Sequence, residues 1–156
     1  MSARAGARPG AAKSLRGRAL AYLARREHSR AELTRKLAPH AESPDELARV
    51  LDRLVSEDLL SDRRFVESLV RRRASRFGLR RVAHELKGHE LSDGLLSEAF
   101  DALSHSEFDR ALDVWQQRFG HAPVDAREQG RQMRFLAARG FGGEVVARVI
   151  RRAKQR

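Results

Sequence analysis

Two pairs of adjacent carboxylates come nearest to a catalytic arrangement in this sequence. Asp45 is followed by Glu46, and Glu57 is followed by Asp58. Neighbouring carboxylates can bind a divalent cation and support metal-assisted hydrolysis of a phosphodiester. Both pairs stand at predicted helix ends, where the electrostatics of the helix terminus already explain charged side chains. We therefore interpret them as structural residues and expect no catalytic residue.

Other residue types that carry chemistry are absent or unsuitably spaced. The chain has no cysteine, which excludes disulfides, thiol catalysis and Cys-ligated metals. His84 and His89 are five residues apart and so miss the spacing of a helical metal pair. There is no phosphate-binding GxxxxGK[ST] motif, and Gly140, Gly142 and Gly143 join two predicted helices with no preceding strand. We expect neither a metal nor any other cofactor.

Positive charge is the dominant chemical feature of the chain. Its 156 residues include 32 Lys and Arg against 21 Asp and Glu, a formal net charge of +11. All but four of these cations are arginine. Arginine binds a phosphate or carboxylate through two parallel hydrogen bonds, whereas lysine acts as a point charge. This balance predicts a polyanionic partner.

The cations concentrate on two consecutive predicted helices and at the C-terminus. On the first helix, Arg64 and Arg71 lie opposite the apolar Phe65; on the second, Arg80 and Lys87 lie opposite the apolar side. The C-terminal cations are explained equally well by favourable helix-end electrostatics. The candidate binding residues, which we call the basic set, are Arg64, Arg71, Arg72, Arg76, Arg80, Arg81, Lys87, Arg148, Arg151 and Arg152.

Helices are the elements that must position these side chains. From Leu15 to the end, apolar residues recur at helical spacing, and no segment alternates with period two long enough to predict a strand. Ser29 with Glu32 forms a predicted capping box. Trp115 and Phe119 fit an apolar stripe, so we expect them in a core rather than as stacking platforms for bases.

The helical pattern recurs in three consecutive triplets. Leu37, Leu86 and Leu136 occupy equivalent places about 50 residues apart, and a helix break is expected between Leu103 and Phe108. Because a triplet buries its apolar faces poorly alone, neighbouring triplets extend the core. The prediction is an all-α, elongated array of three tandem three-helix repeats with nine helices. The expected divisions are a disordered basic tail over 1–13 and repeats over 14–60, 61–105 and 106–156, the last with a basic C-terminal end.

No part of the sequence indicates a membrane or secreted protein. Its longest apolar run is only a few residues, far short of a membrane span. The arginine-rich N-terminus lacks the apolar region of a secretory signal. We expect a soluble intracellular protein that has no membrane partner and is a monomer.

Several segments resemble the RecX family of regulators. The middle triplet carries DRRFVESLVRRR at 62–73 and RRVAHEL at 80–86, close to the family pattern. The first triplet contributes REHSR at 26–30, and the third contributes RFG at 118–120 and RFLAARGF at 134–141. Together these motifs cover nearly all of the predicted folded part, in the family's order.

The resemblance implies a function that composition alone does not. Members of this family bind the recombinase RecA in the groove of its nucleoprotein filament and inhibit its recombinase, ATPase and coprotease activities. This implies a non-enzymatic, cytoplasmic protein of DNA repair, homologous recombination and the SOS response, which also contacts single- and double-stranded DNA without sequence specificity. The sequence departs from the family at Lys87-Gly88-His89, where Lys-Gly-Ile is usual.

Two other functions remain open from the residues alone. The first is a stand-alone helical DNA- or RNA-binding regulator of helix-turn-helix type. No predicted helix combines Asn or Gln with Arg in the manner of a base-reading recognition helix, which weighs against it. The second is a metal-dependent nuclease, which rests on the paired carboxylates described above.

Overall fold

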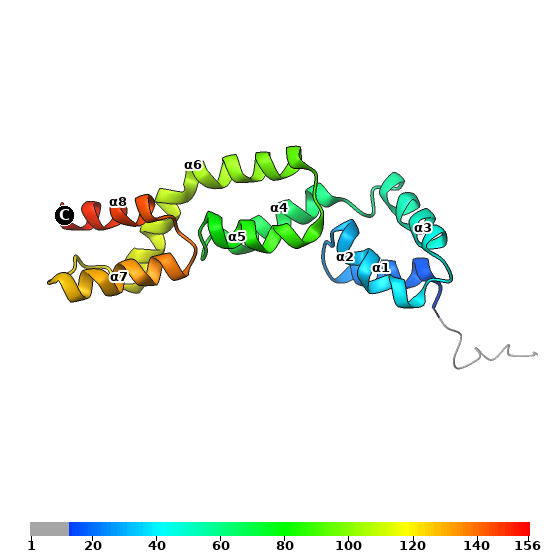
Figure 1. Cartoon of the computed structure of the whole chain (residues 1–156), viewed down its shortest axis with the longest axis horizontal. Coiled ribbons are helices and arrows are strands. Elements are labelled where there is room, and N and C mark those ends of the chain that lie inside the picture. Colours follow the sequence, from blue (N-terminus) through cyan, green and yellow to red (C-terminus); the bar gives the residue numbers. More distant parts are fainter. Residues whose placement is uncertain (1–12) are drawn as a thin grey trace, which may run out of the picture. The chain divides into compact units, whose positions relative to one another are not determined.

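A computed structural model describes residues 13–156, and every regular element in this part of the chain is helical. The predicted tail over 1–13 lies outside the described residues except for Lys13. Contacts divide the chain between Ser61 and Asp62 into two compact units. The helices are α1 (Leu15–Arg25), α2 (Arg30–Leu37), α3 (Pro44–Ser56), α4 (Asp62–Arg73), α5 (Leu79–Leu86), α6 (Asp93–Arg118), α7 (Ala126–Ala138) and α8 (Gly143–Lys154), with 3-10 turns η1 (Ala38–His40) and η2 (Lys87–His89) (Figure 1).

In the first unit, every α-helix begins at a serine. The hydroxyl oxygen of Ser14 accepts a hydrogen bond from the amide of Gly17. The hydroxyl oxygens of Ser29 and Ser43 accept bonds of 3.1 Å from the amides of Glu32 and Glu46. These bonds satisfy amides that the first helical turn leaves unpaired. The predicted cap at Ser29 is confirmed.

The core of the first unit is a cluster of leucines with a buried polar network beside it. His28 is 2% exposed, and its Nδ1 lies 3.0 Å from the carbonyl oxygen of Arg26. Its Nε2 lies 3.1 Å from the ammonium of Lys36, which is a donor, so Nδ1 carries the proton. Burial lowers the pKa of His28, because charging the imidazole there is unfavourable. The core side chains are Leu15, Ala19, Leu33, Leu37, Leu47, Leu51, Leu54 and Leu60.

The predicted helix break between Leu103 and Phe108 is wrong. A single 26-residue helix, α6, runs through this segment, so the described residues contain eight α-helices and not nine. The segment has no proline or glycine to stop a helix, and the Ser106 hydroxyl bonds the carbonyl oxygen of Ala102 at 3.3 Å within the helix. Its first half packs into one core of the second unit and its second half into another (Figure 1).

The three leucines predicted to be equivalent are all buried in separate cores. Leu37, Leu86 and Leu136 each have 0% exposure, and each belongs to a different apolar cluster. His89 stands where the family usually has isoleucine, and its ring packs on Phe65 with ring centroids 4.4 Å apart. The repeat pattern therefore locates one core in each triplet. Within residues 13–156, no helix has the length and apolarity needed to cross a bilayer.

In the second unit, the turn before α5 docks on the turn after α7. The amide of Gly78 donates to the carbonyl oxygen of Arg139 at 2.8 Å, and the amide of Arg80 donates to the carbonyl oxygen of Gly140 at 3.2 Å. Gly140 has φ +91°, a backbone conformation that favours glycine. Two segments about 60 residues apart in sequence are thus joined through backbone groups.

Two side chains of α6 hold these turns in place. The guanidinium of Arg110 donates to the carbonyl oxygens of Phe77 at 2.8 Å and Ala74 at 3.0 Å. The buried carboxylate of Glu107 accepts a hydrogen bond from the amide of Gly142 at 3.2 Å. One helix thereby fixes the ends of α4 and α7 relative to each other.

Candidate interaction surfaces

Most of the basic set is exposed at the surface. Arg71, Arg72 and Arg76 lie at the end of α4 and in the turn that follows. Arg80 and Arg81 begin α5. Nine members are exposed, in keeping with a binding surface: Arg71, Arg72, Arg76, Arg80, Arg81, Lys87, Arg148, Arg151 and Arg152. The tenth, Arg64, is half-buried and already interacts within the protein.

Two acidic residues of the second unit pair with arginines outside the basic set. Arg73 contacts Glu85 at 3.1 Å, and Arg63 contacts Glu98 at 2.7 Å. Among residues 13–156, no exposed member of the basic set forms an ion pair. Their positive charge is therefore available to an external anion.

A second group of arginines lies over aromatic rings. Arg81 from the basic set is centred 4.5 Å from the Phe77 ring, and Arg148 is 4.3 Å from Phe108. The basic set leaves out four further arginines of this kind, Arg73, Arg118, Arg131 and Arg139. Arg118 is adjacent to Phe119 in the sequence, and Arg139 is four positions after Phe135. The contacts of Arg118 with Phe135, Arg131 with Phe119 and Arg139 with Phe77 join distant positions, and helical periodicity carries no sign of them.

Trp115 is in the core, as predicted, whereas Phe119 lies at its edge. The indole of Trp115 is 1% exposed and donates to the side-chain oxygen of Gln132 at 2.8 Å. Phe119 is half-buried and meets Phe135 edge-on, with ring centroids 5.4 Å apart. Phe119 therefore has a face near the surface that the apolar pattern did not predict.

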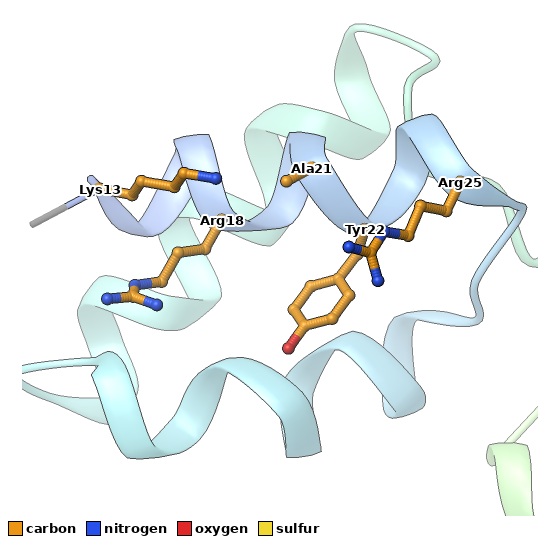
Figure 2. Close-up of a pocket in the computed structure, with 5 residues that line it drawn as sticks. All are labelled: Lys13, Arg18, Ala21, Tyr22 and Arg25. Atoms are coloured by element: carbon orange, nitrogen blue, oxygen red, sulfur yellow. The ribbon is translucent and has the colours of Figure 1, made fainter.

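The first unit carries a small basic pocket that sequence analysis also missed. It has a volume of about 220 Å³ and is lined by residues of α1 and the segment just before it. Figure 2 shows the guanidinium of Arg25 beside the ring of Tyr22, with the side chains of Lys13 and Arg18 towards the beginning of α1. Arg18, Tyr22 and Arg25 follow at i, i+4 and i+7, a spacing readable in the sequence. Among the residues that the structure describes, no acidic side chain lines the pocket, so its chemistry suits an anion.

The paired carboxylates have structural partners. Glu46 accepts a hydrogen bond from the amide of Glu42 at 2.8 Å. Glu57 contacts Arg16 at 2.6 Å and Arg53 at 2.8 Å, and hydrogen bonds from these two arginines lower its pKa. Within residues 13–156, no three His, Asp or Glu side chains are grouped to hold a metal ion.

Comparison with known protein families matches each triplet separately. The models described as the first, second and third three-helix domains of RecX match residues 16–54, 61–99 and 105–150. These matches cover most of the chain and fall in the expected order. The all-α prediction of three three-helix repeats is confirmed.

Individual relatives agree with the domain matches. The chain is 56% identical over 140 residues to regulatory protein RecX of Ralstonia nicotianae, covering 90% of this chain and 88% of that protein. It is 53% identical to that of Leptothrix cholodnii, covering 90% and 89%. The crystal structure of RecX from Lactobacillus salivarius has the same fold, with a TM-score of 0.76, 19% identity and coverage of 91% and 96%. The chain therefore belongs to the RecX family of regulatory proteins.

Proposed function

We propose that this protein modulates the RecA recombinase by binding its nucleoprotein filament and inhibiting it, in DNA repair, homologous recombination and the SOS response. Membership of the RecX family carries the proposal, through three matched domains and 56% identity to a named regulatory protein. The protein acts as a cytoplasmic monomer without catalytic activity of its own.

The unpaired arginines provide a physical basis for filament binding. A nucleoprotein filament presents DNA phosphates and acidic protein side chains, and arginine binds both bidentately. Arg71, Arg72 and Arg76 are exposed and have no acidic partner within residues 13–156. Binding in the filament groove would obstruct a second DNA strand and restrain the motion of recombinase subunits.

The most direct test is the ATPase activity of RecA on single-stranded DNA, titrated with this protein. The proposal expects inhibition at less than one molecule per recombinase subunit, because one bound molecule in a groove affects its neighbours. Unchanged ATPase activity across the titration would refute the proposal. Bovine serum albumin at equal concentration controls for non-specific effects.

Free-DNA binding separates this function from that of a stand-alone regulator. A sequence-specific regulator binds one defined duplex far more tightly than random DNA at physiological salt. The proposed filament regulator binds different duplexes with similar, salt-sensitive affinity. A strong preference for one duplex among a randomised pool would favour the regulator.

A further inference from the structure

Arginine and phenylalanine side chains form one connected series across the second unit. We call it the arginine–aromatic ladder. It links the turn after α4 to α7 and to the end of α6. The ladder consists of Arg73, Phe77, Arg81, Arg139, Phe135, Arg118, Phe119 and Arg131.

Two arginines each bridge two rings. The guanidinium carbon of Arg139 lies 5.5 Å from the centroid of Phe77 and 5.0 Å from that of Phe135. That of Arg118 lies 5.4 Å from both Phe135 and Phe119. Contacts of this length are in the range of cation–π attraction. The series therefore continues without a gap from one three-helix domain to the next.

The backbone docking described above fixes the ladder. The amide of Gly78 binds the carbonyl oxygen of Arg139, which places Phe77 beside the Arg139 side chain. The guanidinium of Arg110 donates a hydrogen bond to the carbonyl oxygen of Phe77 at 2.8 Å. A surface whose side chains are already ordered loses less conformational entropy when a ligand binds.

The ladder keeps most of its charge unneutralised. Arg73 pairs with Glu85, but within residues 13–156 Arg81, Arg118, Arg131 and Arg139 form no ion pair. Arg81, Arg118 and Arg131 are exposed, and the three phenylalanines are half-buried. A guanidinium resting on a ring still has its N–H edge for a phosphate and its outer plane for a base.

We propose that the arginine–aromatic ladder is a binding surface for single-stranded nucleic acid without sequence preference. Phosphates bind the guanidinium edges, and unpaired bases stack on the outer guanidinium planes and on the accessible parts of the rings. A duplex hides the faces of its bases, so it would use only the charge of the ladder and not its flat surfaces.

This surface differs from the basic set. The two share only Arg81; the remaining arginines of the ladder lie on α4, α6 and α7 and, for Arg139, directly after α7. Binding of free single strands requires no recombinase. The inference thus goes beyond the proposed function and can be tested separately from it.

The test replaces arginine with lysine, which keeps the charge and removes the plane. Arg118→Lys with Arg139→Lys is the test variant. Arg127→Lys with Arg134→Lys is the matched control, because both lie exposed on α7 and neither contacts a ring. Binding of fluorescein-labelled oligothymidine and of a random duplex is measured by anisotropy at several salt concentrations. Circular dichroism checks that both variants are folded.

The proposal expects the test variant to lose about tenfold in affinity for oligothymidine. Affinity for the duplex and the salt dependence of binding should stay close to those of the unmodified protein, because the net charge is unchanged. The control variant should bind both ligands normally. These results together would support the ladder as a stacking surface.

Three results would overturn the proposal. One is the absence of oligothymidine binding by the unmodified protein, and another is unchanged binding by the test variant. The third is an equal loss for single strand and duplex, which would reduce the ladder to a source of charge. RecA ATPase is assayed in parallel. If the unmodified protein does not inhibit the ATPase, only the proposed function is rejected. If the test variant loses inhibition but still binds oligothymidine normally, the ladder contacts protein and this inference is rejected.

Discussion

The backbones of Gly78 and Gly140 are packed directly against each other. A Cβ atom on Gly78 would lie 2.5 Å from the carbonyl carbon and oxygen of Gly140, and one on Gly140 would lie 2.5 Å from the Cβ of Arg81. Real Cβ atoms do not approach other atoms so closely, so only glycine fits at both positions. This contact joins the second and third three-helix domains and aligns the side chains of the ladder.

Alanine at either glycine should therefore destabilise the second unit. We expect Gly78→Ala to lower the free energy of unfolding by about 2–4 kcal/mol, because the backbones must separate. Gly140→Ala should cost as much or more, since its positive φ adds strain. Urea denaturation measures both. Gly94→Ala is the control, because nothing lies within 4 Å of its Cβ position; equal effects at the three sites would contradict the close packing.

Removal of the Arg110 guanidinium should have a similarly large effect. Arg110 donates to the carbonyl oxygens of Phe77, Ala74 and Leu103 at 2.8–3.0 Å. Arg110→Met keeps much of the apolar stem but removes the donor from the carbonyl oxygens of Phe77 and Ala74, and we expect a loss of about 2–4 kcal/mol in unfolding free energy. Arg110→Lys should recover only part of it, because an ammonium cannot reproduce the planar fork. Full recovery by lysine would show that charge alone matters.

Acid should destabilise the first unit through Glu32. Burial raises the pKa of this carboxyl, but the hydrogen bond from Arg26 at 2.6 Å and the nearby charges of Arg26 and Lys36 lower it from 4.5 to about 2. Because the folded-state pKa is below the ordinary value, the stabilisation is complete above about pH 4.5 and is lost as the pH falls towards 2.

Protonation of Glu32 should lower the free energy of unfolding by about 1–2 kcal/mol after allowance for solvent screening. Thermal unfolding of Glu32→Gln, followed between pH 5 and pH 2 as an assay range, should show a smaller loss of stability than the unmodified protein. Glu42→Gln, at an exposed position, is the control and should keep the full acid sensitivity. An unchanged pH profile for Glu32→Gln would assign the sensitivity to other carboxylates.

Gly130 offers the opposite test, a substitution that should stabilise. It lies inside α7, where glycine costs up to about 1 kcal/mol relative to alanine. A Cβ there would meet only the guanidinium of Arg134, at 2.9 Å, and that exposed group is free to move. We expect Gly130→Ala to raise the free energy of unfolding by about 0.5–1 kcal/mol. A lower free energy of unfolding, measured by urea denaturation, would mean that Arg134 is held in place.

Charge reversal tests the role of the basic set. Arg71→Glu with Arg72→Glu should weaken inhibition of RecA ATPase by at least about fivefold at low salt, because two attractive charges become repulsive. Helicity should be unchanged, since both side chains are exposed at the end of α4. Arg35→Glu with Arg49→Glu, exposed in the first unit, is the control. Equal inhibition by both variants at low salt would show that this face is not the binding surface.

The helices and their cores could be predicted from the sequence because their signals are local. A helix buries residues that recur every three or four positions, so Leu37, Leu86 and Leu136 were assigned to cores before any tertiary contact was known. The cap at Ser29 follows from residues three apart. The break predicted before Phe108 is wrong: the repeat pattern indicates one there, but no residue between Leu103 and Phe108 stops a helix.

By itself, the sequence determined the helical class, the three repeated units and the excess of arginine, all of which depend on composition or short spacing. Only the tertiary structure decided which arginines stand together. Phe77 and Arg139 are 62 positions apart and meet because two glycine turns can pack backbone to backbone. Such a contact depends on the geometry of the whole second unit, and no local period in the sequence records it.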